Sequence, residues 1–402
     1  MTLALVDPYV RAWLEAAFRY LHVVAAIAWI GASFYFIALD LHLLPPERRE
    51  DAGRGVAGEA WEIHGGGFYR VEKFRDAPRR LPEPLHWFKW EAYTTWLSGF
   101  GLFVVLYYLD ARTYLVDRSV AALSPSAAVA ISVGLLVSAW LVYDLLCRAL
   151  GDDDALLGAV LAGLTLLAAW GSAQLFAPRA AWLQVGAMLG TIMAANVFFS
   201  IIPAHWELVR ARQDGREPDP RWALRGKQRS VHNNYLTLPV LVAMLSNHWG
   251  FLYGRAHSWA ILAALMATLA GVRHYFNLRH RGWNVWPILV GGAAALAVVA
   301  WVLRPQHESA AAVAGRQVAF ARVQAVVDDR CLTCHSRHPT RSGFTAPPQG
   351  VVFDTPGQIV ARAGLIQQVA VLTQAMPPGN VTGMTSAERD ELAAWIAAGA
   401  KR

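Results

Sequence analysis

The chain has 402 residues, of which 55% are apolar and 16% are charged, and its net charge is +7. The charged residues are bunched between long uncharged runs, a pattern that is typical of membrane proteins rather than of soluble bundles. The positive balance does not indicate a nucleic-acid-binding protein, because no soluble segment shows a basic face interleaved with stacking side chains.

Eight uncharged runs of 17 to 27 residues lie in the first three hundred residues. Each has the length that an α-helix needs to cross a bilayer. A soluble bundle would show polar helix faces, and the run at 155–178 shows almost none. The sequence therefore predicts an all-α fold in which residues 1–304 form an eight-helix integral membrane bundle. The runs are 20–39, 92–109, 119–143, 155–178, 180–206, 230–254, 256–272 and 282–303.

Lysine and arginine are distributed unevenly between the connections of these runs. The alternate connections on one side hold 20 of them, and those on the side of the N-terminus hold 6. Basic residues concentrate on the cytoplasmic side of membrane proteins. We therefore expect a multi-pass protein of the bacterial inner membrane whose N- and C-termini both lie on the periplasmic side.

Two histidines, His22 and His248, fall in the outer parts of the first and sixth runs. A histidine inside an apolar span is costly and is therefore a functional candidate, with a satisfied packing residue as the alternative. We hypothesise that this pair ligates a non-covalent haem b. Such a relay is needed because about 30 Å of hydrocarbon would separate a cytoplasmic electron source from an acceptor outside.

The stretch GKQRSVHNNYLTLP places His232 beside Asn233 and Asn234 at the entry to the sixth run. Amides can pair with the flat edge of a ligand that carries carbonyl and N–H groups, and a histidine can accept a proton near neutral pH. The stretch EIHGGGFYRVEK adds His64 and a glycine run that allows close backbone approach. We expect these four residues to form a catalytic site on the cytoplasmic side. For the neighbouring cations, simple anchoring of the membrane orientation is the alternative.

Composition changes at residues 305–314, which we predict to be a linker to a C-terminal domain at 315–402. In that domain, Cys331, Cys334 and His335 have the spacing to which haem is covalently attached. The two thiols would bind the haem vinyl groups, and His335 would be an axial iron ligand. A zinc or redox site is the alternative, but the chain has no second cysteine pair to complete it. Covalent haem attachment takes place outside the bacterial cytoplasm, in agreement with the orientation expected from the basic residues.

A second iron ligand is expected downstream, and Met376 and Met384 are the candidates. We favour Met376, because two prolines after it hold irregular backbone, whereas Met384 abuts the start of a helix. A methionine and histidine pair raises the iron potential, which suits an electron acceptor. The last helix is expected to begin at a capping box of Thr385 and Glu388. These features predict a small single-haem cytochrome c domain.

Several long stretches resemble one family. EAWEIHGGGFYRVEKF, LHWFKWEAYTTWLSGFGLF, SVHNNYLTLPVLVAMLSNHW and VRHYFN, followed by the CxxCH domain, are similar to the bacterial membrane-bound urate oxidases, the PuuD-type urate hydroxylases. The resemblance extends over essentially the whole chain. It implies an oxidoreductase that converts urate to 5-hydroxyisourate and passes two electrons through covalent haem c to a terminal oxidase or a soluble cytochrome c. It assigns neither the urate-binding residues nor the haem b.

Two other functions stay open. One is a non-catalytic electron-transfer subunit with haem b and haem c, and the other is a quinol dehydrogenase of the same architecture. The polar and glycine-rich loops on the cytoplasmic side argue against a pure carrier, which needs no such site. Urate is a planar monoanion near neutral pH, and its edges match amide and guanidinium donors.

Overall fold

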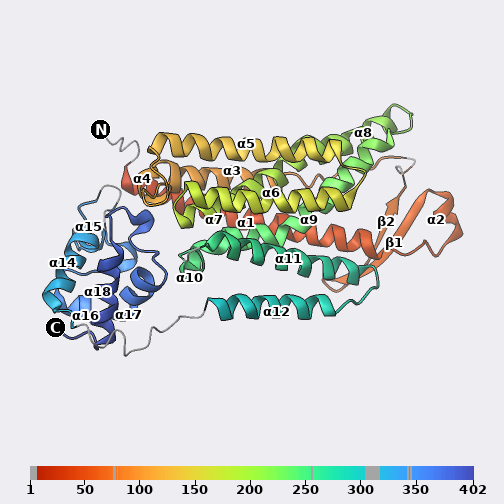
Figure 1. The fold of residues 1–402 in the computed structure, drawn as a ribbon. Helices are drawn as coiled ribbons and strands as arrows, with labels where there is room; N and C mark the ends of the chain where they lie inside the picture. The colour runs from red at the N-terminus through yellow and green to blue at the C-terminus, as the bar shows by residue number, and fades with distance from the viewer. Residues whose placement is uncertain are drawn as a thin grey trace.

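The computed structural model describes residues 7–75, 78, 80–254, 257–303, 317–341, 344 and 346–402. It shows a bundle of long helices that run side by side, with a smaller helical domain at one end and a β-hairpin at the other (Figure 1). The expected linker at 305–314 lies outside the described residues.

The long helices of the described chain make up the length of the bundle. Several begin where the sequence supplies a cap: the side chains of Asp7, Ser124 and Asp153 each accept a backbone N–H of the first turn. The helices are α1 (Pro8–His42), α3 (Trp90–Phe103), α5 (Pro125–Ala149), α6 (Asp154–Leu175), α7 (Pro178–Asn196), α9 (Pro220–Leu245), α11 (Ser258–His280) and α12 (Pro287–Val302).

Short elements extend or connect these helices. After α3 come the π-helical segment η1 (Val104–Tyr108) and α4 (Ala111–Tyr114). A second π-helical segment, η2 (Val197–Ile201), joins α7 to α8 (Ile202–Gln213). The single turns η3 (Ser246–His248) and α10 (Gly250–Tyr253) follow α9, so the expected sixth run at 230–254 is broken after Leu245.

Five helical segments of the described chain are long and apolar enough to cross a membrane. They are Tyr9–His42, Pro125–Ala149, Asp154–Leu175, Pro178–Gln213 and Ser258–His280. The three other expected runs lie on α3, α9 and α12. Helix α3 has 14 residues before it changes to η1, α12 has 16, and α9 carries basic and amide side chains along its first half.

An antiparallel hairpin between α1 and α3 departs from the all-α expectation. Strands β1 (Val56–His64) and β2 (Gly67–Phe74) pair with His64 opposite Gly67. The two residues between them, Gly65 and Gly66, have φ values of 57° and 82°. Two-residue hairpin turns require such positive φ values, which glycine adopts without strain. The glycine run therefore forms a turn, and not the close approach to a ligand that we expected.

The hairpin is held to the short helix α2 (Arg49–Gly53) by charge. Asp51 of α2 and Glu59 of β1 both form ion pairs with Arg70 of β2. Both carboxylates are buried, so a shared guanidinium is needed to satisfy them.

The C-terminal domain has a core of its own, which includes Val323, Ile359, Leu392 and Trp395. The predicted capping box is confirmed: the Glu388 N–H donates to the Thr385 hydroxyl at 3.2 Å, and the Thr385 N–H donates to the Glu388 carboxylate at 2.7 Å. The elements are α14 (Phe320–Arg330), α15 (Leu332–His335), η4 (Pro348–Gly350), α16 (Pro356–Ala361), α17 (Ala363–Ile366), η5 (Gln367–Leu372), η6 (Pro378–Asn380) and α18 (Ser386–Ala397).

This domain docks on the bundle through α4 and α10. Segment η6 contacts α4, η5 contacts α10, and Arg341 donates to the Thr113 hydroxyl at 3.0 Å. Ala375, between η5 and η6, packs against the hydrophobic core of the bundle. The approach is close at Gly254, where an added Cβ would overlap the carbonyl oxygen of Thr373.

Gly254→Ala is therefore expected to push the η5–η6 segment off α10, because a backbone carbonyl cannot move aside as a flexible side chain can. Overpacking of this kind costs about 1–3 kcal/mol, so the melting temperature of the purified protein should fall by several degrees. Gly271→Ala is the matched control: its Cβ would have no atom within 4 Å, and alanine should leave the melting temperature unchanged or raise it. A Gly254→Ala protein as stable as the wild type would contradict the observed docking.

Candidate functional site

One helical turn holds the cysteine and histidine motif of the C-terminal domain. The backbone N–H groups of Cys334 and His335 both donate to the carbonyl oxygen of Cys331, at 3.1 and 2.9 Å. Both thiols are free, and burial raises the pKa of Cys331 to about 12. In the described ranges, no group of three or more acidic, cysteine or histidine side chains is placed to hold a metal ion.

The ring of His335 is oriented as an iron ligand requires. Its Nδ1 lies 3.0 Å from the carbonyl oxygen of Val351 and donates to it. Burial lowers the pKa of His335, and the bond to Val351 only partly opposes this effect, so the ring is neutral at neutral pH. A ring whose Nδ1–H is held by a carbonyl presents the lone pair of Nε2 to a metal.

The two candidate methionines differ in burial. Met384 is 4% exposed and belongs to the core of the domain, where Asn380 bonds both its N–H and its carbonyl. Met376 is half-buried in the loop between η5 and η6, with its N–H on the carbonyl of Val369 at 2.8 Å. Its thioether is therefore the one outside the core. Two thiols on one turn, a free imidazole nitrogen and this thioether form a donor set that suits a covalently bound haem.

His22 and His248 lie in different surroundings. His22 of α1 packs against Gly99 of α3, and its Nδ1 donates to the carbonyl of Thr95 at 2.9 Å. His248 ends η3 and is exposed, close to the C-terminal domain. No ring contact joins the two histidines among the described residues, and the Nδ1 of His22 lies on a backbone carbonyl, as that of His335 does.

Helix α9 directs His232, Asn233 and Asn234 to different neighbours. Successive residues of an α-helix are about 100° apart around its axis, so three in a row cannot all face one ligand. His232 and Asn233 face α5 and α7, whereas Asn234 faces α1 and α11. The expected catalytic group is thus divided between two networks.

The first network, called the Tyr143 network, consists of Tyr143, Asn196, His232 and Asn233. The Tyr143 hydroxyl lies 2.7 Å from His232 Nδ1 and accepts from Asn196 Nδ2 at 3.0 Å. Asn196 Nδ2 also donates to Asn233 Oδ1 at 3.0 Å. In the bond between Asn196 and Tyr143, the amide is the donor and the hydroxyl oxygen is the acceptor. The hydroxyl hydrogen of Tyr143 is therefore available to donate to His232. The network can move a proton from the phenol to the imidazole.

Four charged side chains lie beside the Tyr143 network. Arg229 Nη2 donates to Asp144 Oδ1 at 2.7 Å, and Arg148 Nε donates to Asp144 Oδ2, also at 2.7 Å. Arg225 reaches the same carboxylate at 3.4 Å. The guanidinium carbon of Arg229 lies 4.9 Å from the centre of the Tyr143 ring. One carboxylate therefore faces three guanidinium groups.

The second network, called the Arg273 network, joins Asn234 to Arg273 and Asn277 of α11. Asn234 Oδ1 accepts from Arg273 Nε and from Asn277 Nδ2, both at 3.0 Å. Arg273 also donates to Asn277 and covers the ring of Phe34, with its guanidinium carbon 4.3 Å from the ring centre. All three polar side chains are buried. This network satisfies its own members and links α9 to α11.

His64 lies apart from both networks. It is the last residue of β1, it is exposed, and the hairpin extends away from the helices at the end opposite to the C-terminal domain (Figure 1). The structure does not bring His64 together with His232.

Sequence reasoning missed Tyr143, Asp144 and Asn196. A signal for them exists: Asn196 is an amide inside a long apolar run, and Asp144 is an acid at the end of another. Polar residues in such runs are costly and mark internal partners. Arg225, Arg229 and His232 also recur at the four- and three-residue spacing that places side chains on one helix face.

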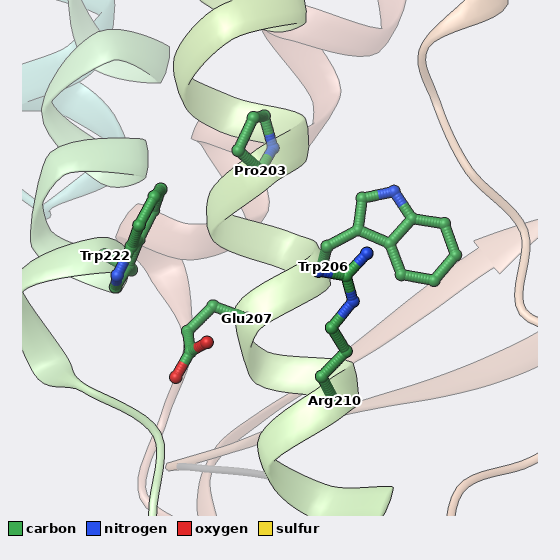
Figure 2. Close-up of a pocket in the computed structure, with 5 residues that line it drawn as sticks. All are labelled: Pro203, Trp206, Glu207, Arg210 and Trp222. Carbon is green, nitrogen blue, oxygen red and sulfur yellow. The ribbon is translucent and has the colours of Figure 1, made fainter.

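A shallow pocket of about 290 Å³ lies between α8 and the start of α9. Figure 2 shows Trp222 on one side of it and Trp206 with Arg210 on the other. Arg210 covers the ring of Trp206, and Glu207 is paired with Arg216. The pocket contains none of the site residues expected from the sequence.

Comparison with known families identifies the bundle. The family model described as urate oxidase N-terminal matches residues 8–304, which include α1, the hairpin and all the helices through α12. No curated protein and no solved structure matches the chain. The match ends before the C-terminal domain. The chain belongs to the urate oxidase N-terminal family.

Proposed function

We propose that this chain is a membrane oxidoreductase that oxidises urate to 5-hydroxyisourate in the bundle and delivers the electrons to a haem c in the C-terminal domain. The observation that carries the proposal is the family match over the bundle. The docked C-terminal turn of Cys331, Cys334 and His335 supports the acceptor. The expected eight spans belong to the proposal, with α3, α9 and α12 added to the five apolar segments.

The reaction balances with water as the oxygen source. Urate monoanion and water yield neutral 5-hydroxyisourate, one proton and two electrons. A base is therefore needed close to the reacting ring, and His232 is our candidate, assisted by Asn233. The Tyr143 hydroxyl would give its proton to His232 Nδ1, 2.7 Å away, while it takes one from the substrate or from water.

The electron acceptor would be held by residues of the C-terminal domain. When bound, haem c supplies a one-electron couple, so urate oxidation requires two successive transfers. Cys331 and Cys334 would attach it, and His335 and Met376 would coordinate its iron. The loop that contains Met376 lies between the two segments that contact the bundle, which supports entry of electrons on this side.

The distance inside the bundle supports a relay. From His232 to the end of α9 at Leu245 is thirteen residues, or about 20 Å at 1.5 Å per residue. A haem b held by His22, with His248 as the second ligand, would divide this path. The bond from His22 to Thr95 supports His22 as a ligand, because it leaves Nε2 free.

The proposed membrane location and orientation are supported by the positions of the C-terminal domain and of the basic connections. The C-terminal domain lies at one end of the bundle, and the basic connections at 44–91 and 203–233 lie at the other (Figure 1). This supports a bacterial inner-membrane protein with both termini in the periplasm. Electrons would leave to a terminal oxidase or a soluble cytochrome c.

An anaerobic spectrum tests the whole proposal. We expect urate to reduce the c-type bands of the oxidised, purified protein, and b-type bands to appear if a membrane haem is present. A protein that dithionite reduces and urate does not would contradict urate oxidation. Reduction by a quinol analogue would then identify a quinol dehydrogenase, and reduction by neither donor would identify an electron carrier.

His232→Ala should lower the rate of urate-dependent haem reduction about 10²–10⁴-fold, the range that general bases contribute. Its haem content should equal that of the wild type. Tyr143→Phe keeps the ring over which Arg229 lies and removes only the hydroxyl, so it should also slow reduction. Stopped-flow absorbance measures both rates. A wild-type rate in His232→Ala would remove this residue as the base.

Met376→Ala should lower the reduction potential of haem c, because the iron loses a ligand that raises it. Met384→Ala should leave the potential unchanged and instead destabilise the domain by about 2–5 kcal/mol, since it opens a cavity in the core. A spectroelectrochemical titration and a thermal melt of each variant separate the two effects. The opposite result would assign Met384 as the ligand.

A further inference from the structure

The charges beside the Tyr143 network do not balance. Asp144 is the partner of Arg148, Arg225 and Arg229. Arg148 is 60% exposed, so the two less exposed guanidinium groups leave one positive charge that Asp144 does not balance. Asp154 is close to Gln228, at 3.5 Å from its amide, but it is exposed. An uncompensated buried charge costs several kcal/mol. The cluster therefore favours an anion.

Arg229 is the member of the cluster that can bind one. Its side chain is 1% exposed and uses only Nη2, on Asp144. Its Nε and Nη1 are buried and have no hydrogen-bond partner among the described residues. Arg148 differs, because it is 60% exposed and water can satisfy it. These two donors lie on different edges of the guanidinium, and each needs an acceptor that the described residues do not supply.

Asn196 presents the complementary group. Its Oδ1 is buried and is also without a partner in the described part of the chain. The orientation of the amide is determined by its neighbours. Asn233 Nδ2 donates to the carbonyl of Met193 at 2.9 Å, so Asn233 Oδ1 faces Asn196 and requires its NH₂ group. Asn196 Oδ1 is therefore left to accept from something else.

These free atoms specify the chemistry of the ligand. Both residues lie against Tyr143: Arg229 over the ring, and Asn196 at the hydroxyl. A free N–H of Arg229 needs an acceptor, preferably a negatively charged one, and the acceptor of Asn196 needs an N–H. A simple inorganic anion lacks the N–H, and a neutral quinol lacks the charge. An anionic oxopurine has both on one planar ring.

We propose that Arg229 and Asn196 are the urate-binding residues of this site: Arg229 donates to the urate anion through a free N–H of its guanidinium, and Asn196 Oδ1 accepts from a ring N–H. This inference rests on the proposed function and names its recognition groups. The substrate ring would lie beside the hydroxyl of Tyr143, in position to deliver its proton toward His232. Both are binding residues, distinct from the base.

The test separates binding from turnover. Protein reduced beforehand with dithionite cannot accept electrons, so radiolabelled urate should bind to it without reacting, and a dissociation constant can be measured. Arg229→Gln should weaken urate binding about 10- to 100-fold, the range of a lost charge-assisted pair. It should raise KM similarly, and because the same side chain holds α9 against α5, kcat is expected to fall as well. Asn196→Ser should weaken binding about tenfold and leave Arg229 in place.

Arg148→Gln is the matched control, because it removes an exposed guanidinium from the same carboxylate. Its dissociation constant should stay within about twofold of the wild type. Haem content and melting temperature establish that each variant is folded. Arg229→Lys, which keeps the charge but loses the planar guanidinium and its separate donors, replaces Arg229→Gln if that variant does not fold. It should weaken binding at least several-fold.

Three outcomes would overturn the inference. Unchanged binding in Arg229→Gln and Asn196→Ser would place urate elsewhere, and equal weakening in Arg148→Gln would show only a general effect of positive charge. Competition by sulfate with the full affinity of urate would indicate an inorganic anion site. A wild-type protein that neither binds urate nor is reduced by it would instead contradict the proposed function, so the two failures are distinguishable.

Discussion

The ion pair between Asp144 of α5 and Arg229 of α9 is the interaction on which the polar interior of the bundle depends. Both groups are buried, so neither can be satisfied by water, and removal of one partner from such a pair costs about 3–5 kcal/mol. The pair sets the rotation of α9 against α5. One turn further along α9, this rotation brings His232 to the hydroxyl of Tyr143 on the same helix as Asp144. Charge and proton-transfer groups are thus aligned by a single contact.

The placement of the C-terminal domain imposes a second constraint. Its docked loop lies at the end of the bundle where α9 and α10 meet, whereas the Tyr143 network lies about 20 Å down α9. A substrate in that network could not touch an acceptor bound to Cys331 and Cys334. Proton and electrons would therefore leave by different routes. The proton needs only the short step from Tyr143 to His232, and the electrons need a path along the helices.

The sequence predicts the parts of this protein that depend on composition and local spacing. The apolar runs predict helices, and the capping box of α18 is confirmed at the expected Thr385. The hairpin was not predicted, although Gly65 and Gly66 between alternating side chains are a hairpin signal. Tyr143, Asp144 and Asn196 could not be joined to His232, because they lie 36 to 89 residues away in sequence and meet it only through packing of three helices. A run of neighbouring polar residues suggested one site, while helical geometry divides it in two.

The two networks differ in whether their buried polar groups all have hydrogen-bond partners. The Arg273 network satisfies each of its buried polar members, so it can hold α9 to α11 with no ligand present. The Tyr143 network and its arginines retain free buried donors and a free acceptor. Native structures keep few unpaired buried polar groups, and where such groups occur they can bind a ligand. Asn234 therefore supports the scaffold on one side of α9, and the groups that a substrate could satisfy lie on the other side, beside His232.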